Sequence, residues 1–166
     1  MFLEKKKKKM AIVLIDYDNI VTRTTELGKI VDFQKLHEYL LKFGEIIFAK
    51  VFIPIREGRI NVPDDLNNFG YEIVACQLMK ESYLIENEKL EDTVDINIIL
   101  AGMEYCNFSD ITDIVVVAHD KHMVNLIKKA KNRKKKVHIV GLDQVSRVLK
   151  RVVDIENIYS TLPVKS

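Results

Sequence analysis

A short apolar run that ends in acidic residues constrains this chain more than any other part of its sequence. Residues 11–15 read Ala-Ile-Val-Leu-Ile, and Asp16, Asp18 and Asn19 follow within the next four positions. The run is too short for a helix and rich in Ile and Val, which is typical of a central parallel strand buried on both faces. In open α/β sheets, functional groups lie just beyond the carboxyl ends of the strands. The stretch therefore predicts a site, with a simple turn after the strand as the alternative.

The rest of the chain alternates between strand-like and helix-like segments. Apolar runs predict further strands at 45–53, 71–78, 111–118 and 137–140. Apolar residues at helical spacing predict helices near 33–43, 63–69, 92–105, 119–132 and 145–153, and a short apolar segment at 155–159 ends the pattern. Residues 21–30 are polar and are predicted as a loop. Residues 80–91 are predicted as a long connection or mobile loop. A lid, an arm and the contact of a homodimer stay open as its role.

This alternation of strands and helices predicts the fold class. It indicates an α/β fold with a parallel sheet, right-handed crossovers and helices on both faces. The length of 166 residues suits one domain with a substantial core. We expect a basic tail at 1–10, a single domain at 11–160 and a C-terminal tail at 161–166.

The composition is that of an ordinary soluble globular protein. Hydrophobic residues make up 48% of the chain and charged residues 30%. No apolar run approaches the roughly 18 residues of a transmembrane helix, and the lysines at 5–9 lead into a strand rather than into a signal peptide. The cytoplasm is therefore the expected location, with no membrane partner. Cys76 and Cys106 lack metal-site spacing and are expected to be reduced thiols.

The net charge of +2 conceals two strongly basic segments. Residues 5–9 are five consecutive lysines, and residues 128–136 contain seven basic residues in nine positions. Separate basic patches favour a polyanionic partner such as nucleic acid. The alternative is that the first segment is a solvated tail and the second the end of a helix.

Three carboxylates occupy positions where the ends of strands and helices could meet. Asp16 ends the first strand, Asp120 follows the fourth, and Asp95 lies in the first turn of the helix before the fourth. If the first and fourth strands are neighbours, Asp16 and Asp120 face one crevice. Several carboxylates in one crevice repel each other unless a cation neutralises them, and Mg²⁺ or Mn²⁺ suits such oxygen ligands. Such an ion can activate water and stabilise charge on a phosphodiester.

Each of these residues also has a simpler explanation. Asp95 follows Asp92 by three residues, much like a capping box, so both could serve the start of the helix. Asp120 could be the N-cap of the next helix. His122, two residues further on, could be an ordinary, partly exposed histidine.

The motifs taken together resemble the NYN domains, a branch of the PIN-like ribonuclease superfamily that includes the LabA-like proteins. The resemblance runs from Ile12 to Tyr159. Its motifs are an Asp and an Asn at Asp16 and Asn19, a Val-Asp pair at 94–95 and an Asp-containing turn at 118–120. The segments Gly-Tyr-Glu-Ile-Val at 70–74 and Lys-Val-His-Ile-Val-Gly at 136–141 also match.

This resemblance implies a fold, an activity and a set of site residues. The fold is a PIN-like three-layer α/β/α arrangement with a parallel sheet of about five strands in the order 3-2-1-4-5. The activity is metal-dependent cleavage of RNA, in which Asp16, Asp95 and Asp120 bind Mg²⁺ or Mn²⁺ and Asn19 positions a phosphate or a bound water. Phosphate contacts supply most non-specific affinity for RNA. The candidates for these contacts are Arg56, Arg59, Lys121, Lys128, Lys129, Lys131 and Arg133.

The third motif departs from the family pattern. Relatives often have Ser-Gly-Asp-Ser-Asp-Phe, whereas this chain has Ala-His-Asp-Lys-His-Met at 118–123, so His122 replaces an acid and Lys121 adds a positive charge. Both changes should weaken binding of a divalent cation. His122 could bind Mn²⁺ instead, and Asp18 or Asp92 could restore the missing charge. A catalytically inactive RNA- or protein-binding module on the same fold is the alternative.

A second enzyme class also fits the first motif. Asp16-Tyr17-Asp18 resembles the Asp-x-Asp nucleophile motif of haloacid-dehalogenase-like phosphatases. There Asp16 would be phosphorylated and Asp18 would act as general acid and base. This alternative leaves the Val-Asp pair at 94–95 unexplained.

Overall fold

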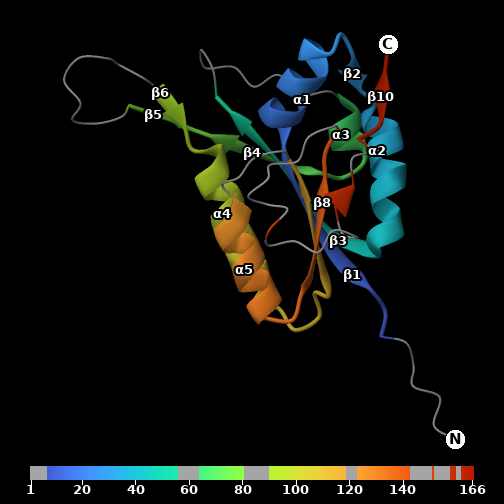
Figure 1. Ribbon diagram of the computed structural model, residues 1–166, viewed down its shortest axis with the longest axis vertical. Coiled ribbons are helices and arrows are strands. Elements are labelled where there is room, and N and C mark those ends of the chain that lie inside the picture. Colours follow the sequence, from blue (N-terminus) through green and yellow to red (C-terminus); the bar gives the residue numbers. More distant parts are fainter. Residues whose placement is uncertain are drawn as a thin grey trace, which may run out of the picture.

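A sheet of six parallel strands forms the centre of the computed structural model, in the order β4-β3-β1-β7-β8-β9 (Figure 1). The structure describes residues 7–55, 64–80, 90–118, 123–142, 151, 158–159 and 162–166. The strands are β1 (Met10–Asp16), β3 (Glu45–Pro54), β4 (Glu72–Cys76), β7 (Asp113–Val117), β8 (Lys136–Val140) and β9 (Ile158–Tyr159). Numbered among themselves, they confirm the predicted order 3-2-1-4-5, and β9 adds a sixth strand at the edge.

The central strand β1 is buried from both sides and both edges. It pairs with β3 along its whole length and with β7 from Ala11 to Ile15. The apolar residues of this stretch are at most 1% exposed. A strand enclosed in this way is a continuous apolar run, which is the pattern that the sequence shows.

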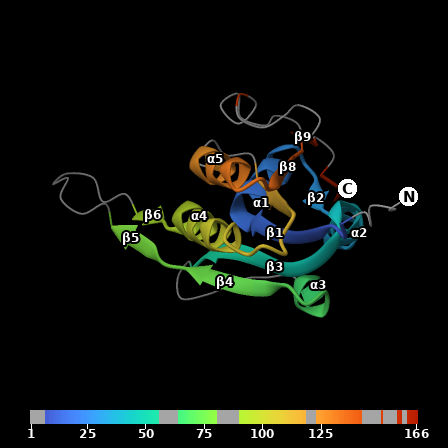
Figure 2. The same cartoon turned by 90° about the horizontal axis from the view of Figure 1, so that it is seen from below.

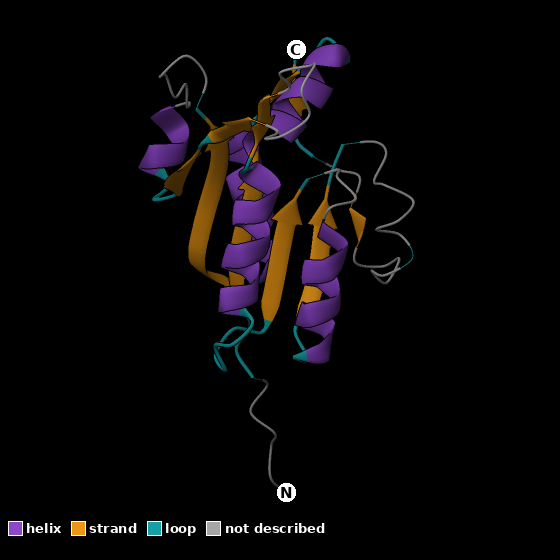
Figure 3. Ribbon diagram, turned by 90° about the vertical axis from the view of Figure 1, so that its left-hand side faces the viewer, coloured by secondary structure: helices purple, strands orange, loops and turns teal. Residues whose placement is uncertain are grey.

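Helices cover both faces of the sheet and divide the core into two clusters (Figures 2 and 3). On one face lie α4 (Val94–Tyr105) and α5 (Val124–Asn132), which approach closely because Gly102 carries no side chain towards Leu126. On the other face lie α1 (Tyr17–Glu26), α2 (Phe33–Leu40), the short helix η1 (Leu41–Phe43) and α3 (Asp64–Asn68). None of the helices in the described part of the chain is long and apolar enough to cross a membrane.

Residues 21–26 belong to α1, so the loop predicted at 21–30 is wrong over most of its length. Only Ile20 and Thr24 of this helix are buried, so its sequence is mostly polar and lacks a clear apolar pattern. The hydroxyl of Thr24 donates to the carbonyl oxygens of Ile20 and Val21, at 3.0 and 2.9 Å, so its polar group is satisfied inside the helix. The helix ends before Gly28, which has a φ of 67°.

Two short antiparallel ribbons replace segments that were predicted as a loop and a tail. At 80–91, β5 (Leu78–Lys80) pairs with β6 (Leu90–Asp92), while residues 81–89 lie outside the described residues. At the C-terminus, β10 (Val164–Lys165) pairs with β2 (Ile30–Val31), and Leu162 is only 3% exposed. The predicted tail at 161–166 is therefore partly docked on the domain. The helix predicted at 145–153 falls almost entirely outside the described residues.

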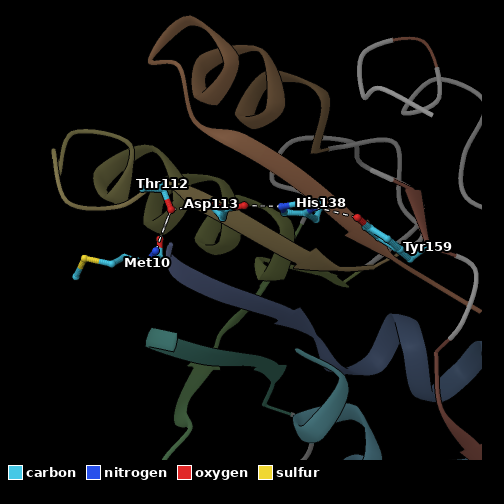
Figure 4. Close-up of polar contacts among 5 residues, drawn as sticks. All are labelled: Met10, Thr112, Asp113, His138 and Tyr159. Atoms are coloured by element: carbon cyan, nitrogen blue, oxygen red, sulfur yellow. Dashed lines mark hydrogen bonds and ion pairs between the residues drawn. The ribbon is translucent and has the colours of Figure 1, made fainter. Parts of the chain in front are cut away.

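A buried polar chain links three strands on the α2 side of the sheet (Figure 4). The carboxylate of Asp113 contacts Nε2 of His138 at 2.7 Å and accepts a hydrogen bond from the Thr112 hydroxyl at 2.6 Å. The other ring nitrogen of His138 lies 3.4 Å from the hydroxyl of Tyr159, on β9. Asp113 and His138 are 3% and 2% exposed. These buried polar contacts therefore connect the edge strand β9 to the middle of the sheet.

This arrangement sets the ionisation of Asp113. Burial by itself would raise the pKa of the Asp113 carboxyl, but the hydrogen bonds from His138 and Thr112 and the nearby charges outweigh it and hold the pKa below its ordinary value. A folded-state pKa below the unfolded one stabilises the fold above the unfolded value of about 3.9. That contribution is lost as the pH falls through the folded-state pKa.

Replacement of Asp113 by Asn should therefore lower stability and its pH dependence together. At neutral pH we expect Asp113→Asn to reduce the free energy of unfolding by about 1–3 kcal/mol, because the buried partners lose a charged acceptor. Below about pH 4, the variant should lose less stability per pH unit than the wild type. Chemical denaturation at a series of pH values measures both effects. Asp110→Asn, at an exposed position nearby, is the control that should change neither.

Candidate active site

The carboxylate of Asp16 lies at the carboxyl end of the central strand. It is 5% exposed, and its Oδ1 accepts a hydrogen bond from the backbone N–H of Asn19 at 3.2 Å. Asp16 is thereby the N-cap of α1, which directly follows β1. The simple turn proposed as the alternative is replaced by the start of this helix, at which Asp16 has a structural role. This role does not exclude a functional one, because the same residue ends the central strand of the sheet.

Strand alternation determines which face of the sheet Asp16 occupies. Ile12 and Leu14, which precede it at two-residue steps, belong to the core cluster under α4 and α5. Phe52, the partner of Asp16 in register on β3, belongs to the same cluster. Asp16 is therefore on the face that α4 and α5 cover.

Asp95 belongs to the same face and to the same edge of the sheet. It is the second residue of α4, and its neighbour Val94 packs in the cluster that contains Leu14. The helix leads from this edge down to Tyr105, and the chain then enters β7 at the opposite edge (Figure 3). Asp16 and Asp95, two of the predicted metal ligands, therefore both lie at the carboxyl edge of the sheet, on the face that α4 and α5 cover.

The start of α4 is fixed by residues that the sequence analysis did not single out. Thr93 is the N-cap residue, and its hydroxyl donates to the carbonyl oxygen of Gln77 at 3.0 Å. The side-chain amide of Asn97 donates to the carbonyl oxygen of Thr93 at 2.8 Å and to its hydroxyl at 3.0 Å. These bonds tie the helix to the end of β4. The only sequence signal was a threonine immediately before a helical pattern.

This capping geometry is different from the capping box proposed for Asp92 and Asp95. A capping box joins the N-cap residue to the third residue of the helix. Because the N-cap is Thr93, the third helical residue is Ile96, and Asp95 is one position too early. Asp92 itself lies in β6, where it pairs in register with Leu78.

The first turn of α1 carries the remaining residues of the first motif. Asp18 and Asn19 are both partly exposed and follow the cap residue directly. Between them and Asp16 lies Tyr17, which stacks on Phe33 with ring centroids 5.7 Å apart. Burial and the charge of Asp18 raise the pKa of the Tyr17 hydroxyl, which keeps it neutral at ordinary pH. Tyr17 therefore anchors α1 on the opposite side of the sheet from the acids.

The third motif begins at the predicted place. Val117 pairs with Ile15 across the β1–β7 ladder, and Ala118 is fully buried with its N–H donating to the carbonyl oxygen of Val140 at 3.2 Å. The chain therefore leaves β7 beside the end of β1. The predicted site residues that follow or lie on another loop fall outside the described residues: Asp120, Lys121, His122, Arg56 and Arg59.

The donor set is chemically suited to a divalent metal ion. Asp16 and Asp95 offer carboxylate oxygens, which Mg²⁺ and Mn²⁺ prefer. Among the residues that the structure describes, no group of three or more His, Cys, Asp or Glu side chains is close enough to hold a metal ion. The predicted third ligand, Asp120, and the further candidate His122 lie outside the described residues.

The predicted RNA-binding residues of α5 lie in the later part of the crossover between β7 and β8. Lys128 and Lys129 are in the middle of α5, whereas Lys131 and Arg133 lie at its end and in the turn that leads into β8. In a strand-helix-strand crossover the helix returns the chain to the amino ends of the strands, so Lys131 and Arg133 lie at the edge of the sheet opposite Asp16. These two residues therefore do not line the acidic edge.

Comparison with known proteins agrees with this fold. The crystal structure of a protein of unknown function from Vibrio parahaemolyticus RIMD 2210633 is similar, with a TM-score of 0.73, 19% sequence identity and coverage of 95% of both chains. At this identity the likeness shows the fold alone. None of the curated proteins matches the sequence.

A family profile covers nearly the whole chain. The profile described as NYN domain matches residues 10–161. This range contains Asp16 and Asp95, the two acids at the carboxyl edge of the sheet, and the third motif. The match decides against the haloacid-dehalogenase-like alternative for Asp16-Tyr17-Asp18. The chain belongs to the NYN domain family, within the PIN-like nuclease superfamily.

Proposed function

We propose that this chain is a Mg²⁺- or Mn²⁺-dependent ribonuclease that cleaves RNA phosphodiester bonds at the carboxyl edge of its sheet. The observation that carries the proposal is the position of Asp16, a buried carboxylate at the end of the central strand. It lies on the face that α4 covers, and Asp95 is the second residue of α4. The family of the chain supports a nuclease. The metal, the RNA substrate and the roles of single residues are our proposal.

Asp16, Asp95 and Asp120 would hold the metal ion, with Asp18, Asp92 or His122 as further donors. When bound, such an ion supplies charge to stabilise the phosphodiester and acidifies a water molecule. Asn19, the third residue of α1, would position a phosphate oxygen through its side-chain amide. The start of α1 and the start of α4 both favour an anionic group, because helix N-termini carry partial positive charge.

A non-catalytic RNA- or protein-binding module is the second candidate. The departures in the third motif, His122 in place of an acid and Lys121 beside it, specifically favour it. Both changes reduce the negative charge available to a divalent cation. Cleavage assays on the whole chain distinguish the two candidates.

Asp16→Asn should abolish cleavage without unfolding the protein. We expect the rate of RNA cleavage in Mn²⁺ to fall by on the order of 100-fold or more, because an amide replaces a charged ligand. Asn is as good an N-cap as Asp, so α1 should remain stable. Fluorescent single-stranded and hairpin RNAs provide the assay, and thermal unfolding verifies the fold.

The chain offers a closely matched control for this substitution. Asp32 is the N-cap of α2, with backbone angles of −89° and 91° against −84° and 94° at Asp16, and it accepts from the N–H of Lys35 at 3.1 Å. Asp32→Asn changes the same group in the same local geometry, but on the other face of the sheet from Asp16 and Asp95. It should cleave RNA like the wild type. Equal cleavage by the wild type and Asp16→Asn would instead support the non-catalytic module.

The residue at position 122 should set the preference for the metal ion. If His122 binds the metal, the wild type should cleave faster in Mn²⁺ than in Mg²⁺, because Mn²⁺ accepts imidazole more readily. His122→Asp should raise the Mg²⁺ rate relative to the Mn²⁺ rate by about 10-fold, since a carboxylate suits the harder ion. Cleavage rates at equal concentrations of the two ions give this ratio. An unchanged ratio would exclude His122 from the metal site.

A further inference from the structure

Two lysine-rich segments that are far apart in the sequence meet at the amino edge of the sheet. The N–H of Met10 donates to the Thr112 hydroxyl, and the N–H of Thr112 donates to the carbonyl oxygen of Met10, both at 2.9 Å. The N–H of Lys136 then donates to the carbonyl oxygen of Thr112 at 3.0 Å. The start of β1 and the start of β8 are therefore two strand spacings apart, about 10 Å.

The segments that precede β1 and β8 both lie at the lower end of the molecule in Figures 1 and 3. We call the surface at this end the amino-edge surface. Its exposed basic side chains are Lys7, Lys8, Lys9, Lys131, Arg133, Lys134 and Lys136. The backbone at Lys9 is held in place, because its carbonyl oxygen accepts from the N–H of Glu45 at 3.0 Å and packs against Gly44, where a side chain would clash.

Acidic groups only partly offset this charge among the described residues. Glu45 forms a salt bridge with Lys8, and Glu104 and Asp110 are exposed nearby on α4 and on the turn before β7. Asp113 is buried and bonded to His138. The surface thus retains a strongly positive potential, which attracts polyanions.

A row of aromatic rings begins beside this basic surface. The rings of Phe48 and Tyr105 stack, with centroids 4.9 Å apart and planes 23° from parallel, and Phe108 follows at 6.0 Å from Tyr105. Phe48 and Phe108 are 42% and 48% exposed. The ammonium group of Lys135 donates to the carbonyl oxygens of Phe108 and Ile111, each at 2.7 Å, which fixes the Phe108 segment against the basic turn.

We infer that the amino-edge surface, together with Phe48 and Phe108, binds single-stranded RNA. Cations that follow a phosphate backbone next to exposed rings that stack on bases are the combination used for single strands. A lipid surface would use the charge but has no need of a row of stacked rings. The choice of RNA as the polyanion rests on the proposed function, but the site is separate, because it lies about 20 Å from Asp16 along β1.

Binding of a fluorescent single-stranded RNA of 20 nucleotides tests the charge of this surface. The full chain carrying both Lys134→Glu and Lys136→Glu should bind at least about 10-fold more weakly at low salt. The slope of log affinity against log salt should become shallower by about 1.4, since each phosphate contact to a single strand contributes about 0.7. Lys29→Glu, at an exposed lysine after α1, is the matched control and should leave both quantities unchanged.

The stacking contribution has a different signature. Phe108→Ala should weaken binding by about 5- to 100-fold and leave the salt slope unchanged, because stacking involves no counterions. Leu27→Ala removes an equally exposed apolar side chain on α1's C-cap and should have no effect. If Phe108→Ala lowers the thermal unfolding temperature, the two lysine substitutions still test the surface.

The assay separates this inference from the proposed function. RNA binding at the amino-edge surface should persist in Asp16→Asn, even where cleavage is lost. A wild type that does not cleave but shows both binding signatures would contradict the ribonuclease and support the surface. Unchanged RNA affinity in the lysine and Phe108 variants would overturn the inference. The inference would also be overturned if these variants lost binding to phosphatidylserine vesicles but kept their RNA affinity. That result would assign the surface to a membrane.

Discussion

The burial of β1 between β3 and β7 is the constraint on which the rest of the structure depends. From Ala11 to Ile15 its backbone groups are paired on both edges, and the apolar side chains of this stretch, which are 0–1% exposed, reach into both core clusters. Each buried Val, Leu or Ile contributes on the order of 2 kcal/mol, against a total stability of roughly 5–15 kcal/mol. The register of this strand is therefore fixed, because a slip by one residue would turn every side chain to the other face. The position of Asp16 is fixed with it.

The parallel arrangement then gives the molecule two chemically different edges. Because the strands run in one direction, all their carboxyl ends lie at one edge, together with Asp16 and the start of α4. All their amino ends lie at the opposite edge, together with the lysines of the amino-edge surface. Residues far apart in the chain, such as Lys9 and Lys136, come to the same edge of the sheet, with only the start of β7 between them. The net charge of +2 hides this division. The acids of the described residues at one edge and the lysines at the other thus give the two edges charge of opposite sign.

The sequence predicts the parts of the fold that are coded locally. The strand runs and the helix near 33–43 follow from periodicity. The structure begins this helix at the N-cap Asp32, and Gly44 follows its last turn with a φ of 140°. The strand order came from the family resemblance, since periodicity does not say which strands are neighbours. The ribbons β2–β10 and β5–β6 escaped prediction because short strands gain their stability from distant partners. The candidate site stays a prediction, but the sequence did indicate the positions of two of its residues. Asp16 was placed at a strand end and Asp95 at a helix start, where the structure has them. The bond of Thr93 to Gln77 was not predicted, because only the fold brings Gln77 beside it.

Asp16 and Asp32 show why local pattern alone does not identify a functional residue. Both are aspartates at helix N-caps, with nearly the same backbone angles and the same bond to the third residue of the helix. They differ in what precedes them. Asp32 follows the two-residue strand β2 near the C-terminal ribbon, whereas Asp16 follows the fully enclosed β1 and faces the start of α4. Identical capping chemistry therefore serves a helix in one case and places a carboxylate at the centre of the sheet edge in the other. The difference arises from tertiary position, which is why burial distinguishes the two residues and their local sequence does not.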